Sequence, residues 1–380
     1  MRSTAPAASW RRMARHPCRS AGTAGAWRWP MPQPDPALPL ADIRVVDLGW
    51  ITAGAASSTM LLDLGASVVK VEGPGAPDPF RQWEGADLGT DWWNRSPFFA
   101  FTNRGKQSLC LDLKDPLGRE ALLRLLEGAD VLVENFRRGV MASFGLDAGM
   151  LRQRFPRLVI ASISSQGETG PDRDMVSFGS TLEATGGLAA LTGAGDAPVI
   201  TGRDVNYPDQ VVCLFASGAI IAALLERDRT GQGAHLDLSQ RELTSFLLGE
   251  ELIAAAAGAP SPRHGNLDPG EPEERLVADG QGGWRAEWPG GSASVRDGVT
   301  LAAAADFAAG TAVLRSPDGA PAKGIPFRLA RRPLAVRDCC HALGADNHAV
   351  LLAAGFEADD IDRLEAAGVL ADRPRPTGRG

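Results

Sequence analysis

The chain has 380 residues and a formal net charge of -7, with 44% hydrophobic and 22% charged residues. This composition excludes wholesale disorder, and the length allows roughly two domains. The negative charge argues against nucleic acid as the main partner, and no apolar run approaches the roughly 20 residues that a membrane helix needs. The five cysteines follow no regular spacing, which favours a reducing compartment and hence a cytoplasmic location.

The first 34 residues differ from the rest of the chain because they contain six arginines and no acidic residue. An Arg-rich, acid-poor start resembles a transit peptide. The segment has no clear amphipathic period, however, so we favour a mispredicted start codon, with Met31 as the true first residue. Under either interpretation residues 1–37 are predicted to lie outside the fold, either as a disordered extension or as residues added by the mispredicted start codon.

Strands and helices are predicted to alternate from residue 43 onward. Residues 43–48 and 67–72 are β-rich runs, and a helix of small residues over 52–64 separates them. A strand–helix–strand unit of this length implies a parallel pair of strands. The alternation continues with predicted strands 107–114, 130–136 and 157–164 and predicted helices 115–125 and 148–155. The predicted fold class is therefore α/β, with a doubly wound, Rossmann-like parallel sheet.

The second half of the chain indicates two domain boundaries. The pattern predicts a helix from about 179, an apolar helix from 210, a strand over 234–238, a capped helix over 239–257 and terminal helices over 347–354 and 357–368. Residues 260–300 are rich in Gly, Pro and charge, and predict loops with a small irregular β region. We therefore divide the chain into a large domain over 38–258, a reduced small domain or linker over 259–330, and helices over 331–380 that return to the large domain.

The sequence predicts neither a dinucleotide site nor a metal site. The turn over 49–54 lacks the G-x-G-x-x-G pattern that follows the first strand of NAD-binding folds. Cys339, Cys340 and His341 are contiguous, but adjacent side chains diverge and no C-x-x-C accompanies them. Cys213 lies on an apolar helix face, where a core position is expected.

Asp209 is the carboxylate with the most suggestive position. It follows Pro208 and precedes the apolar helix predicted from Gln210, so it lies at or near a helix N-cap. A capping role alone is the common reason for an Asp at such a place. A catalytic role would use the same physics, because a helix N-terminus favours the ionised carboxylate and supplies donors for an oxyanion.

Several stretches together resemble the class III CoA-transferases, a family that also contains the 2-methylacyl-CoA racemases. The matching stretches follow one another in family order over residues 40–48, 61–72, 103–114, 133–137, 166–171, 230–233, 264–269 and 364–369. The resemblance covers about residues 38–270 and 340–370. It implies a large CoA-binding domain and a dimer of two interlocked chains.

The resemblance also implies a nucleophile. Counting back from Thr230, in the turn that ends the long helix, places the family's covalent aspartate on Asp209. Its carboxylate would attack a donor thioester to give a mixed anhydride, and CoA thiolate would return to form an enzyme thioester that the acceptor acid consumes. The implied activity is transfer of CoA between an acyl-CoA and a carboxylic acid. Coenzyme A thioesters are then substrates, with no tightly bound cofactor.

Matching the family residue by residue implies a set of CoA-binding positions. These are Ile51, Thr52, Ala53, Leu111, Lys114, Asn135, Phe136, Arg137 and Val140. Lys114 and Arg137 are the natural phosphate partners. An alternative remains for some of them, because Leu111 and Phe136 could be core residues and Lys114 a solvated charge.

The chain departs from the family pattern at three places. Gly179 stands where the best-known transferases carry a glutamate, and Thr52 replaces a glutamine typical of formyl-CoA transferases. Residues 176–179 lack the His-Asp pair of the racemases, which disfavours racemisation because that reaction needs an acid and a base. The segment 270–330 is shorter than the family's small domain. A racemase and a non-catalytic or half-active CoA-binding subunit with a related partner chain therefore remain alternatives to a homodimeric transferase.

Overall fold

The computed structural model describes most of the chain from Leu38 to Arg375. The described residues are 38–83, 89–193, 206–260, 263, 275–280, 283–296, 300–301, 304, 313–319, 321–325, 327–330 and 334–375. The predictions for residues 1–37, for the motif at 264–269 and for parts of the segment 259–330 lie outside them.

A six-stranded parallel sheet forms the centre of the described structure. The strand order is β3-β2-β1-β4-β5-β6, and every pair of neighbours is parallel. The strands are β1 (Arg44–Asp47), β2 (Ser67–Glu72), β3 (Gln107–Cys110), β4 (Val131–Glu134), β5 (Val159–Ser164) and β6 (His235–Ser239). The order runs outward in both directions from β1 and β4, as a doubly wound fold requires. The predicted fold class is confirmed.

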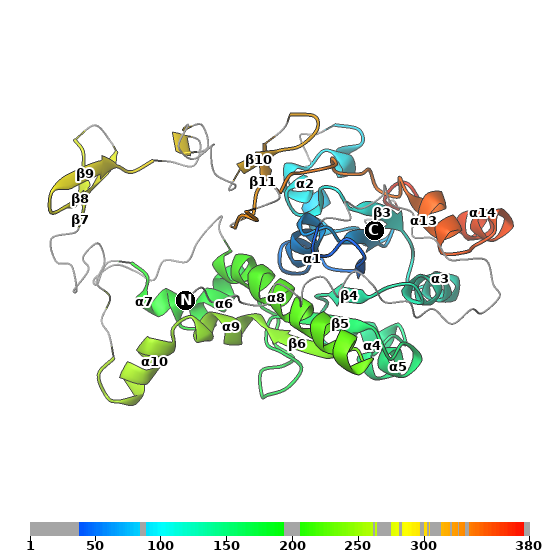
Figure 1. The fold of residues 1–380 in the computed structure, drawn as a ribbon, viewed down its shortest axis with the longest axis horizontal. Coiled ribbons are helices and arrows are strands. Elements are labelled where there is room, and N and C mark those ends of the chain that lie inside the picture. Colours follow the sequence, from blue (N-terminus) through cyan, green and yellow to red (C-terminus); the bar gives the residue numbers. More distant parts are fainter. Residues whose placement is uncertain are drawn as a thin grey trace, which may run out of the picture.

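Helices cover both faces of this sheet (Figure 1). The α/β body contains α1 (Ala53–Asp63), α2 (Pro97–Asn103), α3 (Pro116–Leu126), α4 (Val140–Ser143), α5 (Ala148–Arg154), α6 (Gly179–Thr185), α7 (Leu188–Leu191), α8 (Tyr207–Thr230), α9 (Gln240–Phe246), α10 (Gly249–Ala256), α13 (Asn347–Ala353) and α14 (Ala358–Ala366). Short 3-10 turns occur at η2 (Pro79–Arg81) and η4 (Trp92–Asn94). As the sequence predicts, Asp115 caps α3 and Ser239 caps α9, each by accepting a backbone N–H of the first turn.

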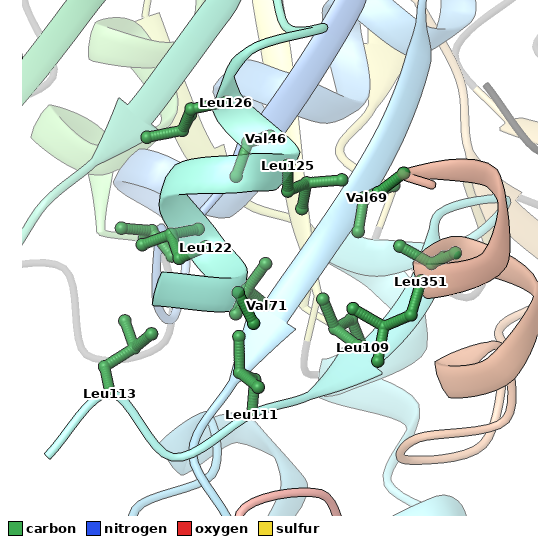
Figure 2. Close-up of a cluster of buried hydrophobic side chains, with 14 of the residues drawn as sticks. Val46, Val69, Val71, Leu109, Leu111, Leu113, Leu122, Leu125, Leu126 and Leu351 are labelled. Carbon is green, nitrogen blue, oxygen red and sulfur yellow. The ribbon is translucent and has the colours of Figure 1, made fainter. Parts of the chain in front are cut away.

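Alternating strand residues divide the core into two clusters, one on each face of the sheet. Val45, Val68 and Val131 face α1 and α8 in one cluster. Val46 and Val69 face α3, α5, α13 and α14 in the other. Figure 2 shows Leu351 of α13 pointing toward Leu109 and Val69 of the sheet. Because both faces are covered, the strands are apolar on both sides, as is typical of a buried parallel sheet.

The structure corrects three predicted boundaries. The strand predicted over 107–114 ends at Cys110, and the helix predicted over 239–257 is divided at residues 247–248 into α9 and α10. The long helix begins at Tyr207 and not at Gln210. Ser245 Oγ donates to the carbonyl of Gly186 near the break between α9 and α10, so a contact with a distant segment accompanies that interruption.

The helix α8 also meets the length and apolarity expected of a membrane span, contrary to the sequence prediction. Its Val212, Ala216 and Ile220 are buried in the cluster that includes α1, and the two helices pack together. This packing is that of a core helix, so the apolarity of α8 is weak support for a membrane segment.

The segment after α10 forms two small antiparallel sheets. The first contains β7 (Arg275–Ala278), β8 (Trp284–Trp288) and β9 (Gly291–Ser294), drawn in yellow away from the α/β body in Figure 1. The second pairs β10 (Val313–Arg315) with β11 (Pro321–Lys323). Lys323 donates to Gln210 Oε1 of α8, and Ile325 packs with Leu38. The chain therefore contacts the large domain again before residue 331, where we predicted its return.

Candidate functional site

A cavity of about 740 Å³ opens at the carboxyl ends of the parallel strands. Its walls come from the loop after β1, the segments after β2, β3 and β4, the end of β5, the first turns of α8 and α9, and Arg375. In doubly wound sheets ligands bind at this edge, where the strand order reverses between two central strands. The volume lies within the range of pockets that bind small molecules and cofactors.

The loop after β1 is held in an uncommon backbone conformation. Ile51 has a φ of 60°, which a β-branched residue rarely adopts. Its backbone N–H donates to both carboxylate oxygens of Asp78, at 3.1 and 3.2 Å. Asp78 forms a buried ion pair with Lys70 at 3.0 Å, and the Lys70 ammonium also donates to the Gly49 carbonyl. The buried pair therefore fixes the backbone of residues that line the cavity.

Asn135 joins the loop after β4 to the loop after β1. Its Oδ1 accepts from the Trp50 N–H at 2.6 Å, and its Nδ2 donates to the Trp50 carbonyl at 3.1 Å. The Trp50 and Phe136 rings contact edge to face with centroids 5.4 Å apart. Gly49 and Gly54 approach so closely that a Cβ on Gly49 would lie 2.6 Å from Gly54 backbone atoms. These contacts bring two strand-end loops together as one wall.

Asp209 lies in the first turn of α8, with a side chain that faces the cavity. The N-cap is Asn206, so Asp209 is not the cap that the sequence suggested. Gln240 Nε2 donates to Asp209 Oδ1 at 2.5 Å. Burial raises the pKa of Asp209 to about 6, the hydrogen bond from Gln240 opposes the rise, and the negative charge of Glu183 adds to it. Asp209 is therefore a carboxylate that ionises just below neutral pH.

Asp209 differs from the other carboxylates that line the cavity in having no cationic partner among the described residues. Glu72 receives two hydrogen bonds from Arg81. Asp112 pairs with Arg375, and Asp174 with Arg138. A buried carboxylate that relies on one neutral donor keeps more of its basicity than a carboxylate paired with a cation.

Basic side chains line the exposed part of the same cavity. Lys114, Arg137, Arg138, Arg173 and Arg375 are all exposed to solvent. Arginine and lysine at a cavity entrance suit a phosphorylated ligand, because charge-assisted hydrogen bonds to phosphate oxygens are strong. One cavity thus combines exposed cations with a buried carboxylate.

The structure brings nine of the ten sequence-predicted site residues to this cavity. Its lining includes Asp209 and the predicted ligand positions Ile51, Thr52, Ala53, Lys114, Asn135, Phe136, Arg137 and Val140. Leu111 is placed elsewhere, because its fully buried side chain packs in the core and its backbone bridges to Leu370. The Leu111 side chain is therefore a core residue, which is the alternative that the sequence left open. The ligand roles of the other eight predicted CoA-binding positions stay predictions.

Gln240 and Arg375 are two of the lining residues that the sequence did not single out. Gln240 comes shortly after the predicted strand 234–238, so its place at the carboxyl end of a parallel strand was a usable signal. Arg375 gave no local signal, because it reaches the cavity from the end of the described chain by bonding Asp112 and the Gly368 carbonyl.

The Asn206 side chain lies directly beside Gly179. A Cβ on Gly179 would lie 2.5 Å from the Asn206 side chain, so this position has no room for a larger residue unless Asn206 moves. One turn further along α6, Glu183 is buried, and its charge acts on Asp209. The carboxylate expected from the family pattern is thus absent at Gly179, while another carboxylate lies near the site.

A second carboxylate with a raised pKa lies behind the loop after β4. Burial raises the pKa of Glu134 to about 7. Its Oε2 accepts from the Phe136 N–H at 2.9 Å and so supports the cavity wall. The Ser162 hydroxyl, which also bonds Glu134, lies 3.0 Å from His235 Nε2. In the described part of the chain no group of three or more His, Cys, Asp or Glu side chains is placed to hold a metal ion.

Comparison with known proteins identifies the family. The model of CoA-transferase family III matches residues 40–310. The chain belongs to CoA-transferase family III. Its resemblance to class III CoA-transferases, inferred from the ordered motifs, is thereby confirmed.

Relatives within CoA-transferase family III carry transferase names. The chain is 36% identical over 256 residues to succinyl-CoA--D-citramalate CoA-transferase of Chloroflexus aurantiacus, covering 66% of this chain and 61% of that protein. It is 36% identical over 235 residues to succinate--glutarate CoA-transferase of Agrobacterium fabrum, covering 61% and 58%. A third relative, 33% identical over 57% of this chain and 53% of its own length, is the beta subunit of a Chloroflexus succinyl-CoA--L-malate CoA-transferase. The match spans about three fifths of the first two relatives.

A solved structure of similar fold is also found. A CaiB/BaiF family protein from Brucella suis superposes with a TM-score of 0.77 at 25% identity, covering 83% of this chain and 99% of that one. The similarity supports the α/β architecture that the strand order shows independently.

Proposed function

We propose that this protein transfers CoA from an acyl-CoA thioester to a carboxylic acid through covalent intermediates on Asp209. The observation that carries the proposal is the single cavity that contains both the cations suited to CoA phosphates and a buried carboxylate without a cationic partner among the described residues. Family membership and the names of the relatives support the reaction class. We further propose a cytoplasmic location and a dimer of interlocked chains.

In this mechanism Asp209 attacks the carbonyl carbon of the donor thioester. A C–O bond forms, the C–S bond breaks, and CoA leaves as the thiolate. The thiolate then attacks the Asp209 carboxyl carbon of the mixed anhydride, which releases the donor acid and leaves CoA on the enzyme as a thioester. The acceptor acid repeats these two steps in reverse order, and the Asp209 carboxylate is regenerated.

The proposal is tested by trapping the intermediates. The purified protein is incubated with succinyl-CoA and other acyl-CoAs, with and without dicarboxylic acceptors, and treated with hydroxylamine or borohydride. We expect mass spectrometry to find the modification on Asp209, and Asp209→Ala to abolish both the modification and the transfer. Full transferase activity in Asp209→Ala would refute the proposal.

Two alternatives are distinguished from the transferase by further measurements. A racemase would exchange the α-proton of a 2-methylacyl-CoA with deuterium without transferring CoA, but the lining residues that the structure describes include no histidine. A CoA-binding subunit would bind acyl-CoA and remain inactive until a related chain is added. The beta-subunit relative supports testing the second alternative.

A further inference from the structure

We propose that the Gln240 side-chain amide is a catalytic oxyanion donor for the steps in which a nucleophile attacks the carboxyl carbon of Asp209. The inference deepens the proposed function and rests on Asp209 being the covalent residue. It concerns the two steps after the mixed anhydride has formed, and it assigns no role to Gln240 in the first attack on the donor thioester.

The geometry places one donor on one oxygen of the nucleophile. Gln240 Nε2 donates to Asp209 Oδ1, and no donor among the described residues is found for Oδ2. The side chain of each residue lines the cavity, and each residue is buried, with 6% of Gln240 and 8% of Asp209 exposed. Oδ2 is therefore the oxygen that can attack, while Oδ1 remains the carbonyl oxygen of the anhydride and keeps its hydrogen bond.

The position of Gln240 is fixed by the local structure. It is the first residue of α9, directly after β6, and the Ser239 hydroxyl caps the helix by accepting from the Glu242 N–H. The Thr244 hydroxyl donates to the Gln240 carbonyl from one turn along the helix. These contacts hold the backbone of Gln240 at a strand–helix junction, and the bond to Asp209 Oδ1 orients its side-chain amide.

The negative charge on Oδ1 decreases when Asp209 attacks the donor thioester and increases when a nucleophile attacks the Asp209 carboxyl carbon. When Asp209 attacks the donor thioester, its own negative charge moves to the acyl group, so a donor on Oδ1 is needed less in the transition state than in the ground state. When CoA thiolate attacks the Asp209 carbon, an S–C bond forms and the carbonyl electron pair moves onto Oδ1. Collapse of this intermediate expels the donor acid. A fixed N–H aimed at Oδ1 stabilises that developing oxyanion.

A neutral donor suits both parts of the cycle. A cation in the place of Gln240 would hold the Asp209 carboxylate ionised but would make it a weaker nucleophile. The Gln240 amide leaves the pKa of Asp209 raised, because burial outweighs the effect of the hydrogen bond. It still supplies the N–H that the oxyanion requires.

The test separates the two covalent steps. Wild type, Gln240→Leu and Gln240→Met are mixed with acyl-CoA without acceptor, quenched at short times and analysed by intact-protein mass spectrometry for an acyl adduct and a CoA adduct. We expect Gln240→Leu to form the acyl adduct at nearly the wild-type rate and the CoA adduct roughly 10²- to 10³-fold more slowly. Gln240→Met, which keeps the length of the side chain without an N–H donor, should accumulate the acyl adduct likewise.

Ser245→Ala is the matched control, because Ser245 lies on the same helix and its hydroxyl bonds the Gly186 carbonyl rather than Gln240 or Asp209. Equal slowing of both adducts in Gln240→Leu, or the same step-specific loss in Ser245→Ala, would overturn the inference and leave the proposed function standing. Absence of any adduct on Asp209 in the wild type would overturn both. A Gln240 variant that still forms the acyl adduct has a folded active site.

Discussion

Asp78 accepts the backbone N–H of Ile51 with both carboxylate oxygens, and so holds a left-handed residue at the wall of the cavity. A β-branched residue in this conformation is strained and persists only where its surroundings impose it. The ion pair between Asp78 and Lys70 lies behind the same loop. The shape of this wall therefore depends on a buried charge pair that does not contact Asp209.

Asp78→Asn is expected to weaken substrate binding as well as stability. It leaves the Lys70 ammonium without its partner, which costs about 3 kcal/mol of unfolding free energy, and it loosens Ile51. We expect the KM for acyl-CoA to rise at least about tenfold, a loss of about 1.4 kcal/mol. The control is Asp63→Asn, which breaks a similarly buried pair with Arg104 away from the cavity. It should lower stability and leave the KM unchanged; an equal KM effect would contradict the prediction.

The transfer rate should fall in acid with the titration of Asp209. In the proposed mechanism Asp209 must be ionised to attack, and burial raises its pKa to about 6. We expect kcat/KM with acyl-CoA to fall about tenfold for each pH unit well below 6. Glu134, whose pKa is raised to about 7, could add a second titration. Glu134→Gln should remove any step near pH 7 and keep the one near pH 6. Loss of the step near pH 6 in that variant would assign it to Glu134 and contradict the prediction.

Asp209→Asn is expected to increase stability while it abolishes transfer. The folded state binds the Asp209 proton more tightly than the unfolded state, because the pKa is raised from 3.8 to about 6. Stability is therefore lost as pH rises through this interval, by roughly 3 kcal/mol at pH 7.5. Urea unfolding should show Asp209→Asn more stable than wild type by about that amount at pH 7.5 and by about half at pH 5. A pH-independent difference would argue against the titration.

Gly49→Ala should destabilise the protein because the new Cβ would lie 2.6 Å from backbone atoms of Gly54. Backbone cannot move aside cheaply, so we expect a loss of about 2–3 kcal/mol in thermal or urea unfolding. Gly218→Ala provides the opposite case, since nothing lies within 4 Å of its Cβ in the middle of α8. It should stabilise by about 0.5–1 kcal/mol.

Lys114→Gln should raise the KM for acyl-CoA without changing kcat, because a phosphate contact is made equally in the ground and transition states. Lys114 is exposed, so the expected increase is modest, at most about tenfold, and it should shrink at high salt. Arg154→Gln removes an exposed cation outside the cavity and should leave the KM unchanged. Equal effects from both substitutions would indicate a general charge effect.

The sheet could be predicted from the sequence because its strands are short apolar runs bounded by clear signals. Residues 67–72 are predicted as a strand and form β2 with the same limits. The predicted helix over 239–257 was wrong in its middle, because it is divided at residues 247–248, directly before Gly249. Gly249 was a local signal for this division, whereas the bond from Ser245 to the Gly186 carbonyl is a long-range contact that local propensity does not encode.

The site was predictable where a family motif or a strand end marked it, and not where distant segments meet. Asp209 and Gln240 are 31 residues apart, and Asp112 and Arg375 are 263 apart. No local pattern records such pairs. Asp209 was expected at a helix N-terminus on local grounds, but its hydrogen bond and its raised pKa require knowledge of α9 and of the burial around it.

The core beneath β2 and β3 is completed from the far end of the described chain. Leu351, Ile361, Leu364 and Leu370 pack with strand residues far earlier in the sequence, and Leu370 bridges to Leu111. Because α13 and α14 are synthesised last, this face of β3 is covered only in part, by α3, while the chain is still being made. We therefore expect this part of the domain to complete its folding after the sheet strands have been translated.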